Sequence, residues 1–558
     1  MSLLVDLFGY LSIVLHGLVI VAQSMALGGV FFLLFLARPF AAGLPDGAGL
    51  VRRTAVIAGL SALALAGGEA LTVAMQSAVL TDTLGLGLPA VIGAAYAVAG
   101  IVKLTAALVL GLLLLGSMAP PAWPLLGLCG VVVAAAVATT HAAARLDHVA
   151  LLLAASALHI VGAAIWVGGI PCFVMMLGRL RDSESFRRVG ARFSRMSMAG
   201  VGCILVSASV FSVVYIGSWG AAYGTAYGVM VGAKVAMFGA LLLLGLGNFL
   251  VVERLRRDPA APVLRMRRFA EVEIGIGFSI FFAAASLTSV PPAVDLVADR
   301  VTWHEIVERN RPAMPRLVSP GHDSLALPAL QARLDAEAAA ARISASPAFV
   351  PGSGELPARN AEDIAWSEYN HHWSGIFVLL IGGLGLLHRA GVQWAKHWPL
   401  VLLGMAVFLF LRSDPEVWPM GEQGFWESFR DVEVLQHGMV VVVIVAVGVF
   451  EWGVRTGRFR RGRFRRGWFR RGGPALVFPL LTALGGALLL THSHAIANVK
   501  DQLLIELTHT PLALAGIGGG WARWLEIRAD GAVRRWAGWV WPVLFMVVGV
   551  MLLLYREA

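Results

Sequence analysis

Apolar runs of 18 residues or more recur along most of the chain, and they constrain its fold more than any other feature. A helix needs a run of this length to cross the apolar core of a bilayer, which is about 30 Å thick. Of the 558 residues, 58% are hydrophobic and 14% are charged, against about 25% charged in an average soluble domain. A soluble protein could not keep so much apolar surface away from water. The sequence therefore predicts an all-α, polytopic bundle of transmembrane helices.

We predict about 14 spans from these runs. The first, second and fifth are long enough to tilt or to extend into the membrane interface. The spans lie near residues 8–37, 51–80, 90–117, 122–143, 148–178, 192–217, 228–252, 269–290, 371–388, 397–412, 432–454, 474–491, 502–522 and 537–555.

Lys and Arg gather in every second loop, and this alternation predicts how the chain is oriented. Basic loops stay on the cytoplasmic side, so we expect an N-out, C-out arrangement with an even number of spans. The loops that hold most of the 44 Lys and Arg residues are 38–53, 178–195, 253–268, 388–397, 455–472 and 523–535.

The most basic of these loops contains RFRRG, RFRRG and WFRRG in tandem at 458–472. Basic residues interleaved with aromatic ones can bind nucleic acid, and the net charge of +10 raises the same question. However, the repeat lies between two spans on the predicted cytoplasmic side, where topology and anionic headgroups explain it more simply. We therefore expect the lipid bilayer, and no nucleic acid, as the partner of this surface.

Residues 292–370 interrupt the membrane pattern with several prolines, an Ala-rich stretch and scattered acids. We predict that this segment is an external (periplasmic) linker. It divides the chain into an eight-span membrane module at 1–291 and a six-span membrane module at 371–558.

Ionisable side chains within the spans of the first module are candidates for function, because they are costly in a bilayer. Glu69 could instead form a buried ion pair with Lys103 or Lys234 that holds helices together. Thioethers suit Cu(I), although Met is also an ordinary packing residue. The residues that we assign to a candidate transport path are His16, Glu69, His159, Met175, Met176 and Lys234.

Four motifs at the end of this module resemble, in order and spacing, the copper resistance protein D family. They are LHIVGAAIWVGGIPCFVMM (158–176), RFSRMSM (192–198), AYGVMVGAKVAMFGALLLLGLGN (226–248) and RRFAEVEIGIGFSIFFAAASLTSVPPA (267–293). The resemblance implies a bacterial inner-membrane protein that handles copper ions, alongside a periplasmic copper chaperone of the copper resistance C type. The residues that fall on motif positions are His159, Trp166, Tyr227, Lys234 and Glu273.

The second module places histidines at the predicted external ends of its spans. Glu433 and His437 are spaced i, i+4, and Glu506 and His509 are spaced i, i+3, so each pair shares a helix face. Imidazole and carboxylate suit Cu(II) or Zn(II), and Met439 could serve Cu(I). The alternative to a metal site is that these histidines only cap helices and face water. The external histidines, of which three or four would bind the metal, are His371, His372, His437, His492, His494 and His509.

These observations predict copper binding and transport across the inner membrane, with the metal captured at the external histidines and passed into the helical bundle. The sequence has no GxxxxGK[ST], GxSxG or HExxH motif, so we expect no enzyme activity and no ATP-driven pumping. Two alternatives stay open. One is a membrane redox protein that holds haem between His16 and His159, and the other is a non-transporting docking or sensor protein for a periplasmic copper chaperone.

Overall fold

The computed structural model is all helical over the residues that it describes, as the sequence predicts. Among these residues, extended backbone pairs only at one isolated β-bridge, between Val417 and Gln423. The residues described are 2–44, 46–117, 120–297, 300–320, 336, 361–414, 417–421, 423–428, 432–458, 473–491 and 499–557.

The chain forms two compact units, each with its own packing. The first covers Met1–Arg300, and the second covers Val301–Leu490 and His494–Ala558. We describe each unit by itself.

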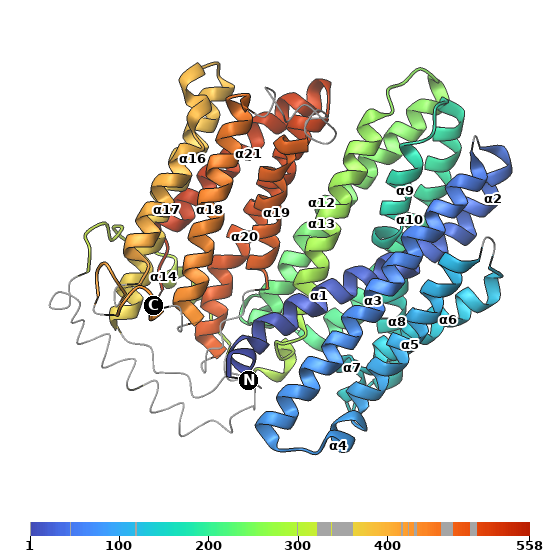
Figure 1. Ribbon diagram of the computed structural model, residues 1–558, viewed down its shortest axis with the longest axis horizontal. Coiled ribbons are helices and arrows are strands. Elements are labelled where there is room, and N and C mark those ends of the chain that lie inside the picture. The colour runs from blue at the N-terminus through green and yellow to red at the C-terminus, as the bar shows by residue number, and fades with distance from the viewer. Residues whose placement is uncertain are drawn as a thin grey trace. The chain divides into compact units, whose positions relative to one another are not determined.

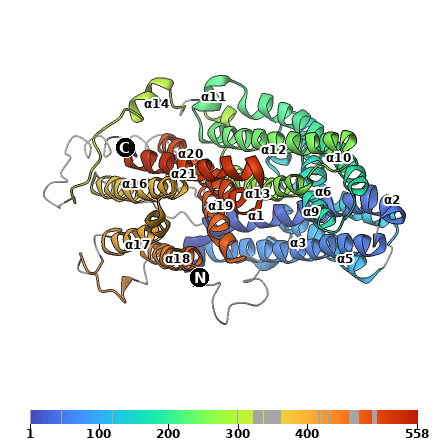
Figure 2. The same cartoon turned by 90° about the horizontal axis from the view of Figure 1, so that it is seen from above.

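The first unit is built from long helices joined by short ones (Figure 1). α3 lies next to both α1 and α5 (Figure 2), and α12 packs against α13. The helices are α1 (Ser2–Phe32), α2 (Arg38–Phe40), α3 (Gly47–Leu84), α4 (Leu88–Ile92), α5 (Ala95–Gly116), α6 (Ala122–Ala138), α7 (His141–Ala144), α8 (Val149–Ala163), α9 (Ile170–Leu177), α10 (Ser183–Phe211), α11 (Trp219–Tyr223), α12 (Ala226–Arg257) and α13 (Leu264–Leu287).

In the described part of this unit, three π-helical segments occur within the long helical stretches. A π-turn inside an α-helix is uncommon and is found frequently at functional sites. The segments are η1 (Leu33–Ala37), η3 (Ala164–Gly168) and η4 (Ser212–Ile216), and two 3-10 turns, η2 (Ala41–Gly43) and η5 (Ala293–Asp295), complete the unit.

The second unit is a helical bundle in which α16 lies along α21 and α20 packs against both α19 and α21 (Figure 1). Its core joins Trp398, Phe478 and Trp541 with Ile381, Leu402 and Ala522. The elements are α14 (Trp303–Arg309), α16 (Ala361–Arg389), η6 (Gln393–His397), α17 (Leu400–Arg412), α18 (Val432–Arg455), η10 (Gly473–Leu476), α19 (Val477–Leu489), α20 (Val499–Arg528) and α21 (Gly531–Leu553).

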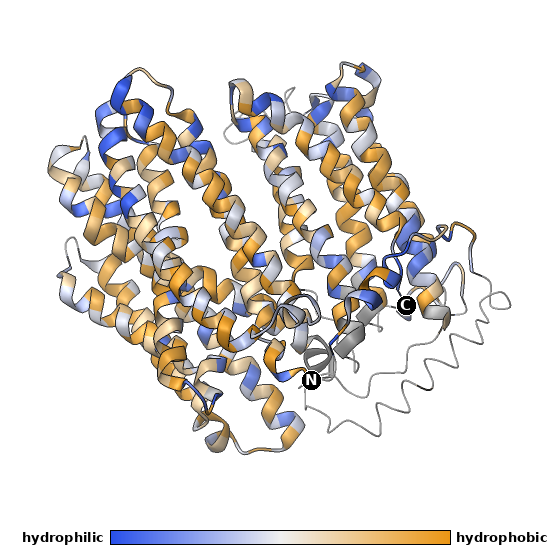
Figure 3. Cartoon of the chain, turned by 180° about the vertical axis from the view of Figure 1, so that it is seen from behind, coloured by the Kyte–Doolittle hydropathy of each residue, from blue (hydrophilic) through white to orange (hydrophobic). Residues whose placement is uncertain are grey.

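Each of the fourteen predicted ranges overlaps a helix. Among the described residues, ten helical segments are long and apolar enough to cross a bilayer, and Ala122–Ala138, Leu400–Arg412 and Gly473–Leu489 are apolar but shorter. Apolar residues occupy most of the length of the helices, and hydrophilic residues gather mainly near the helix ends (Figure 3). The chain is a multi-pass membrane protein.

η3 packs tightly against α1 through glycines. A Cβ atom at Gly168 would overlap the carbonyl oxygen of Ser24, and one at Gly28 would overlap the carbonyl oxygen of Ala164. Small residues let helix backbones approach closely in membrane proteins, where packing replaces the hydrophobic drive. This contact fixes the position of Trp166, which η3 carries.

Candidate functional site

A buried carboxylate in the first unit is held by side chains from two other elements. Glu273 of α13 is buried, and its Oε1 accepts a hydrogen bond of 2.5 Å from Nδ2 of Asn248 on α12. Trp166 of η3 also hydrogen bonds to Glu273. Two donors compensate for part of the cost of burying this acidic group. The three residues come from three different sequence motifs, which the fold therefore brings to one place.

A histidine and a lysine form a second polar group in this unit. The hydroxyl of Ser207 donates to the carbonyl oxygen of Ile204, so its oxygen accepts from Nδ1–H of His159, 2.9 Å away. With the proton on Nδ1, Nε2 of His159 carries the lone pair that could bind a metal. Lys234 of α12 interacts electrostatically with His159, and no carboxylate pairs with Lys234 in the described part of the chain.

The buried ion pair of this unit joins α3 and α5. Nζ of Lys103 contacts Oε1 of Glu69, and both side chains are buried. Of the two partners that the sequence left open for Glu69, the structure places Lys103 there. His16 of α1 interacts electrostatically with Lys103. Four of the candidate path residues thus fall into two groups, His16 with Glu69 and Lys234 with His159.

The methionines of the candidate path lie on α9. Met176 is completely buried, beside the buried Cys172 and Phe173. Phe173 stacks on Phe193 of α10 with ring centroids 4.2 Å apart, so this stretch is well packed. Its contacts are those of packing residues, and a role in a copper path stays a prediction.

A ring cluster in the second unit brings together two of the predicted external histidines. The rings of His371 on α16 and His509 on α20 have centroids 6.3 Å apart, and Tyr555 stacks on His371 at 4.0 Å. Nδ1–H of His371 donates to the carbonyl oxygen of Ser367 at 2.8 Å. Metal-binding histidines characteristically donate their other ring N–H in this way, which orients Nε2 as the ligand.

His372, the neighbour of His371, has a different environment. The backbone N–H of Arg316 donates to its Nδ1 at 2.7 Å, and its Nε2–H donates to the carbonyl oxygen of Tyr555 at 2.8 Å. Because both ring nitrogens are used, binding a metal would cost a hydrogen bond at a buried residue. His372 therefore serves to tie the segment around Arg316 and the C-terminal segment to α16.

Two carboxylates at this end of the second unit were not among the predicted site residues. Glu368 of α16 accepts a 2.5 Å hydrogen bond from Nε of Arg316, and Glu557 accepts one of 2.6 Å from the hydroxyl of Tyr555. Glu368 lies three residues before His371, so the spacing rule that paired Glu506 with His509 could have found it. Glu557 is near the C-terminus, and no local pattern points to it.

The remaining predicted residues are distributed around this end. His437 begins the apolar part of α18, and its Nδ1 lies 2.7 Å from Oδ1 of Asp414. Glu506 is buried and accepts from the hydroxyl of Thr510 at 3.4 Å, whereas Met439 is exposed. His492, His494 and the side chain of Glu433 lie outside the described residues. Within the described part, no group of three or more His, Cys, Asp or Glu residues converges as a metal site.

The contact between Asp414 and His437 should depend on pH. Burial alone raises the pKa of the Asp414 carboxyl, but the hydrogen bond and charge of His437, together with the Ser413 hydroxyl, hold that pKa below its ordinary value. A carboxyl with a lowered pKa stabilises the fold above its unfolded pKa, and this contribution is lost as the pH falls through its folded pKa. We expect the contact to persist at neutral pH and to be lost only at a pH below the ordinary pKa of an aspartate, which is about 3.9.

Infrared difference spectra of the carboxyl band can check this expectation, with Asp414→Asn identifying the band. In His437→Ala the titration midpoint of the Asp414 carboxyl should move to higher pH. Burial still raises the pKa of this carboxyl, and the histidine that lowers it is gone. An unchanged midpoint in that variant would contradict the assignment.

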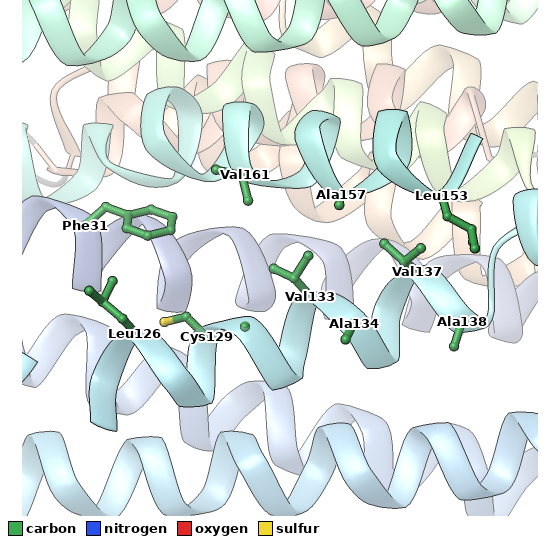
Figure 4. Close-up of a pocket in the computed structure, with 11 residues that line it drawn as sticks. Phe31, Leu126, Cys129, Val133, Ala134, Val137, Ala138, Leu153, Ala157 and Val161 are labelled. Carbon is green, nitrogen blue, oxygen red and sulfur yellow. The ribbon is translucent and has the colours of Figure 1, made fainter. Parts of the chain in front are cut away.

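A cavity of about 520 Å³ lies among α1, α6 and α8 of the first unit. Phe31, Leu126, Val133 and Val161 line it with other apolar side chains and the Cys129 thiol (Figure 4). It offers no imidazole or carboxylate, so its chemistry suits an apolar chain rather than a metal ion.

Comparison with known proteins agrees with the motifs. The model of the family described as copper resistance protein D matches residues 187–287, which include Ser207, Lys234, Asn248 and Glu273. The copper transport protein CutJ of Bacillus subtilis (strain 168) is 30% identical over 137 residues, which make up 24% of this chain and 24% of that protein. The chain thus matches only about a quarter of the length of this curated relative.

No solved structure matches the chain. The chain is therefore a multi-pass membrane protein whose residues 187–287 match the copper resistance protein D family.

Proposed function

We propose that this protein binds copper ions and transports them across the bacterial inner membrane. The observation that carries the proposal is the family match, because it covers the helices that position Asn248 and Glu273 in the buried site with Trp166. The name of the similar Bacillus protein, a copper transport protein, supports the same function.

We further propose that copper enters at the external end of the second unit. Arg389 ends α16, and His371 lies 18 positions before it, which corresponds to roughly 27 Å along the helix. This distance is close to the thickness of a bilayer core. The basic ends of the helices belong in the cytoplasm, which leaves His371 and His509 on the outer side.

The capture site in this proposal consists of His371 and His509, with His492 and His494 as further ligands. His437 is a candidate as well, because Asp414 orients its ring as a carboxylate orients metal-binding histidines. We leave His372 out because both of its ring nitrogens already hydrogen bond. A periplasmic copper chaperone of the copper resistance C type is the proposed donor of the metal.

Passage through the first unit would use His159, whose Nε2 carries the lone pair, and the buried carboxylate of Glu273. His16 and Met175–Met176 are the other candidate ligands. Lys234 would repel a cation near His159 while protonated, so transport through this point would favour a deprotonated or displaced lysine. The pair of Glu69 and Lys103 is internally neutral and would not hold a cation.

Titration of the purified protein with Cu(I) and Cu(II) tests the capture site. The double replacement His371→Ala, His509→Ala should weaken copper binding by more than the roughly 10–100-fold that loss of an orienting partner costs a metal site. His304→Ala is the matched control, because His304 has a side chain that is 88% exposed. Equal affinity in the double variant and the control would remove the proposed site.

Copper flux into vesicles separates transport from docking. Vesicles that contain the protein should accumulate or release copper along an imposed gradient, and Glu273→Gln should reduce this flux without changing capture at the external histidines. A protein that binds copper but gives no flux above empty vesicles would favour the docking or sensor alternative.

A further inference from the structure

A small basic pocket lies at the end of the second unit away from His371. It has a volume of about 160 Å³ and is enclosed by residues of α16, α18, α20 and α21. Three arginines, Arg389, Arg455 and Arg523, line it together with one carboxylate, Glu526. The lining thus has an excess of positive charge, in a protein where buried charges are expected to be paired.

Arg455 is the most buried of these arginines. Its side chain is 8% exposed, and its Nε donates to Oε1 of Glu451 at 2.9 Å. The guanidinium lies over the ring of Trp398, 4.7 Å from the centroid, so the ring fixes its plane. Its Nη2 is buried and hydrogen bonds to nothing within the described part of the structure. A charged donor is therefore held in place at the pocket wall without an acceptor.

Arg523 repeats this pattern. Arg523 pairs with Glu526 and lies over the ring of Trp541, while its Nε is buried and has no acceptor among the residues that the structure describes. Nδ1 of His388 is a further buried ring nitrogen that has no hydrogen-bond partner among the described residues. Leaving buried charged donors unsatisfied is costly, and the two arginine donors around one cavity indicate that a ligand with several acceptor oxygens belongs there.

Glycine keeps this cavity open. A Cβ atom at Gly538 would lie 2.9 Å from Oε1 of Glu526 and 3.0 Å from Nε of Arg389. Any larger residue would therefore intrude between the carboxylate and the arginine. The pocket is a built space rather than an accidental gap between helices.

We propose that this pocket binds a phosphate group, carried by an anionic lipid of the inner leaflet or present as free phosphate. The planar fork of arginine matches phosphate oxygens with two parallel hydrogen bonds. The pocket lies at the basic, cytoplasmic ends of its helices, where basic pockets between transmembrane helices bind phosphate headgroups. The tryptophans that hold Arg455 and Arg523 preorganise the donors.

Binding to the purified full chain in neutral detergent tests the proposal and identifies the source of the phosphate. Phosphatidylglycerol and phosphatidylcholine are added in parallel, and sodium phosphate is compared with sodium chloride at equal ionic strength. Native mass spectrometry counts bound lipid, and the thermal unfolding midpoint reports occupancy. A response to phosphatidylglycerol alone identifies a lipid site, and a response to phosphate as well identifies a site for the free ion. No response to either overturns the proposal.

Substitutions then locate the site. Glu451→Gln with Arg455→Gln removes the arginine without leaving Glu451 charged and unpaired, and it should weaken binding by about tenfold or more. Arg534→Gln, at an exposed arginine on the first turn of α21, should leave binding unchanged. Arg523→Lys gives an independent test with the charge retained and the planar fork removed, and it should also weaken binding. Binding that is equal in all three variants would place the phosphate elsewhere.

Discussion

Replacing Lys103 by Met should destabilise the first unit by about 3–5 kcal/mol. Lys103 is the ion-pair partner of Glu69, and the two side chains are 8% and 6% exposed. Without the ammonium group, the carboxylate is left buried between α3 and α5 with no opposite charge. The free energy of unfolding in a denaturant series in detergent measures the loss.

The control for this prediction removes both charges at once. Glu69→Gln with Lys103→Met should cost much less than Lys103→Met alone, because no uncompensated charge stays buried. Equal losses in the single and double variants would show that the lysine acts through packing of its stem. The double variant also tests function, since a neutral pair that only holds helices together should leave copper flux unchanged.

Gly168→Val should have an effect of similar size, about 4 kcal/mol or more. The added Cβ would overlap the carbonyl oxygen of Ser24, which is backbone and cannot turn aside, so α1 and η3 would have to separate. The unfolding midpoint of the detergent-solubilised chain measures the loss. Size-exclusion chromatography after mild heating should accordingly show little folded, monodisperse protein for this variant.

Gly202→Val provides the matched control for the glycine prediction. Gly202 is on α10 of the same unit, and a Cβ atom there would meet nothing within 4 Å. This variant should unfold at nearly the temperature of the original chain. A comparable loss at both positions would point to a general effect of valine in these helices instead of the contact between α1 and η3.

The helices could be predicted from sequence because a bilayer imposes a local rule. Length and hydropathy decide whether a segment can cross, and both are read from consecutive residues. All fourteen predicted ranges accordingly fall on helices. The π-turn at Ala164–Gly168 could not be foreseen, because it depends on how α1 packs against the segment and not on a local signal.

The candidate sites were predictable only in part. The motifs pointed to Trp166 and Glu273, but Asn248 was not singled out, although it ends one of the quoted motifs. The choice of Lys103 over Lys234 as partner of Glu69 depends on which helices are neighbours, and no spacing rule reaches between helices. His371 and His372 look equivalent in the sequence, and only the positions of Arg316 and Tyr555 distinguish them.

The hydrogen bonds around Glu273 also determine how this protein can be dissected. The family match begins at residue 187, whereas Trp166 lies before it on η3 and η3 is seated on α1 through Gly28 and Gly168. A fragment cut at the start of the match would keep the acid and lose one of its two donors, together with the helix that positions it. Any shortened version intended to retain this site has to include α1 and start near the beginning of the chain.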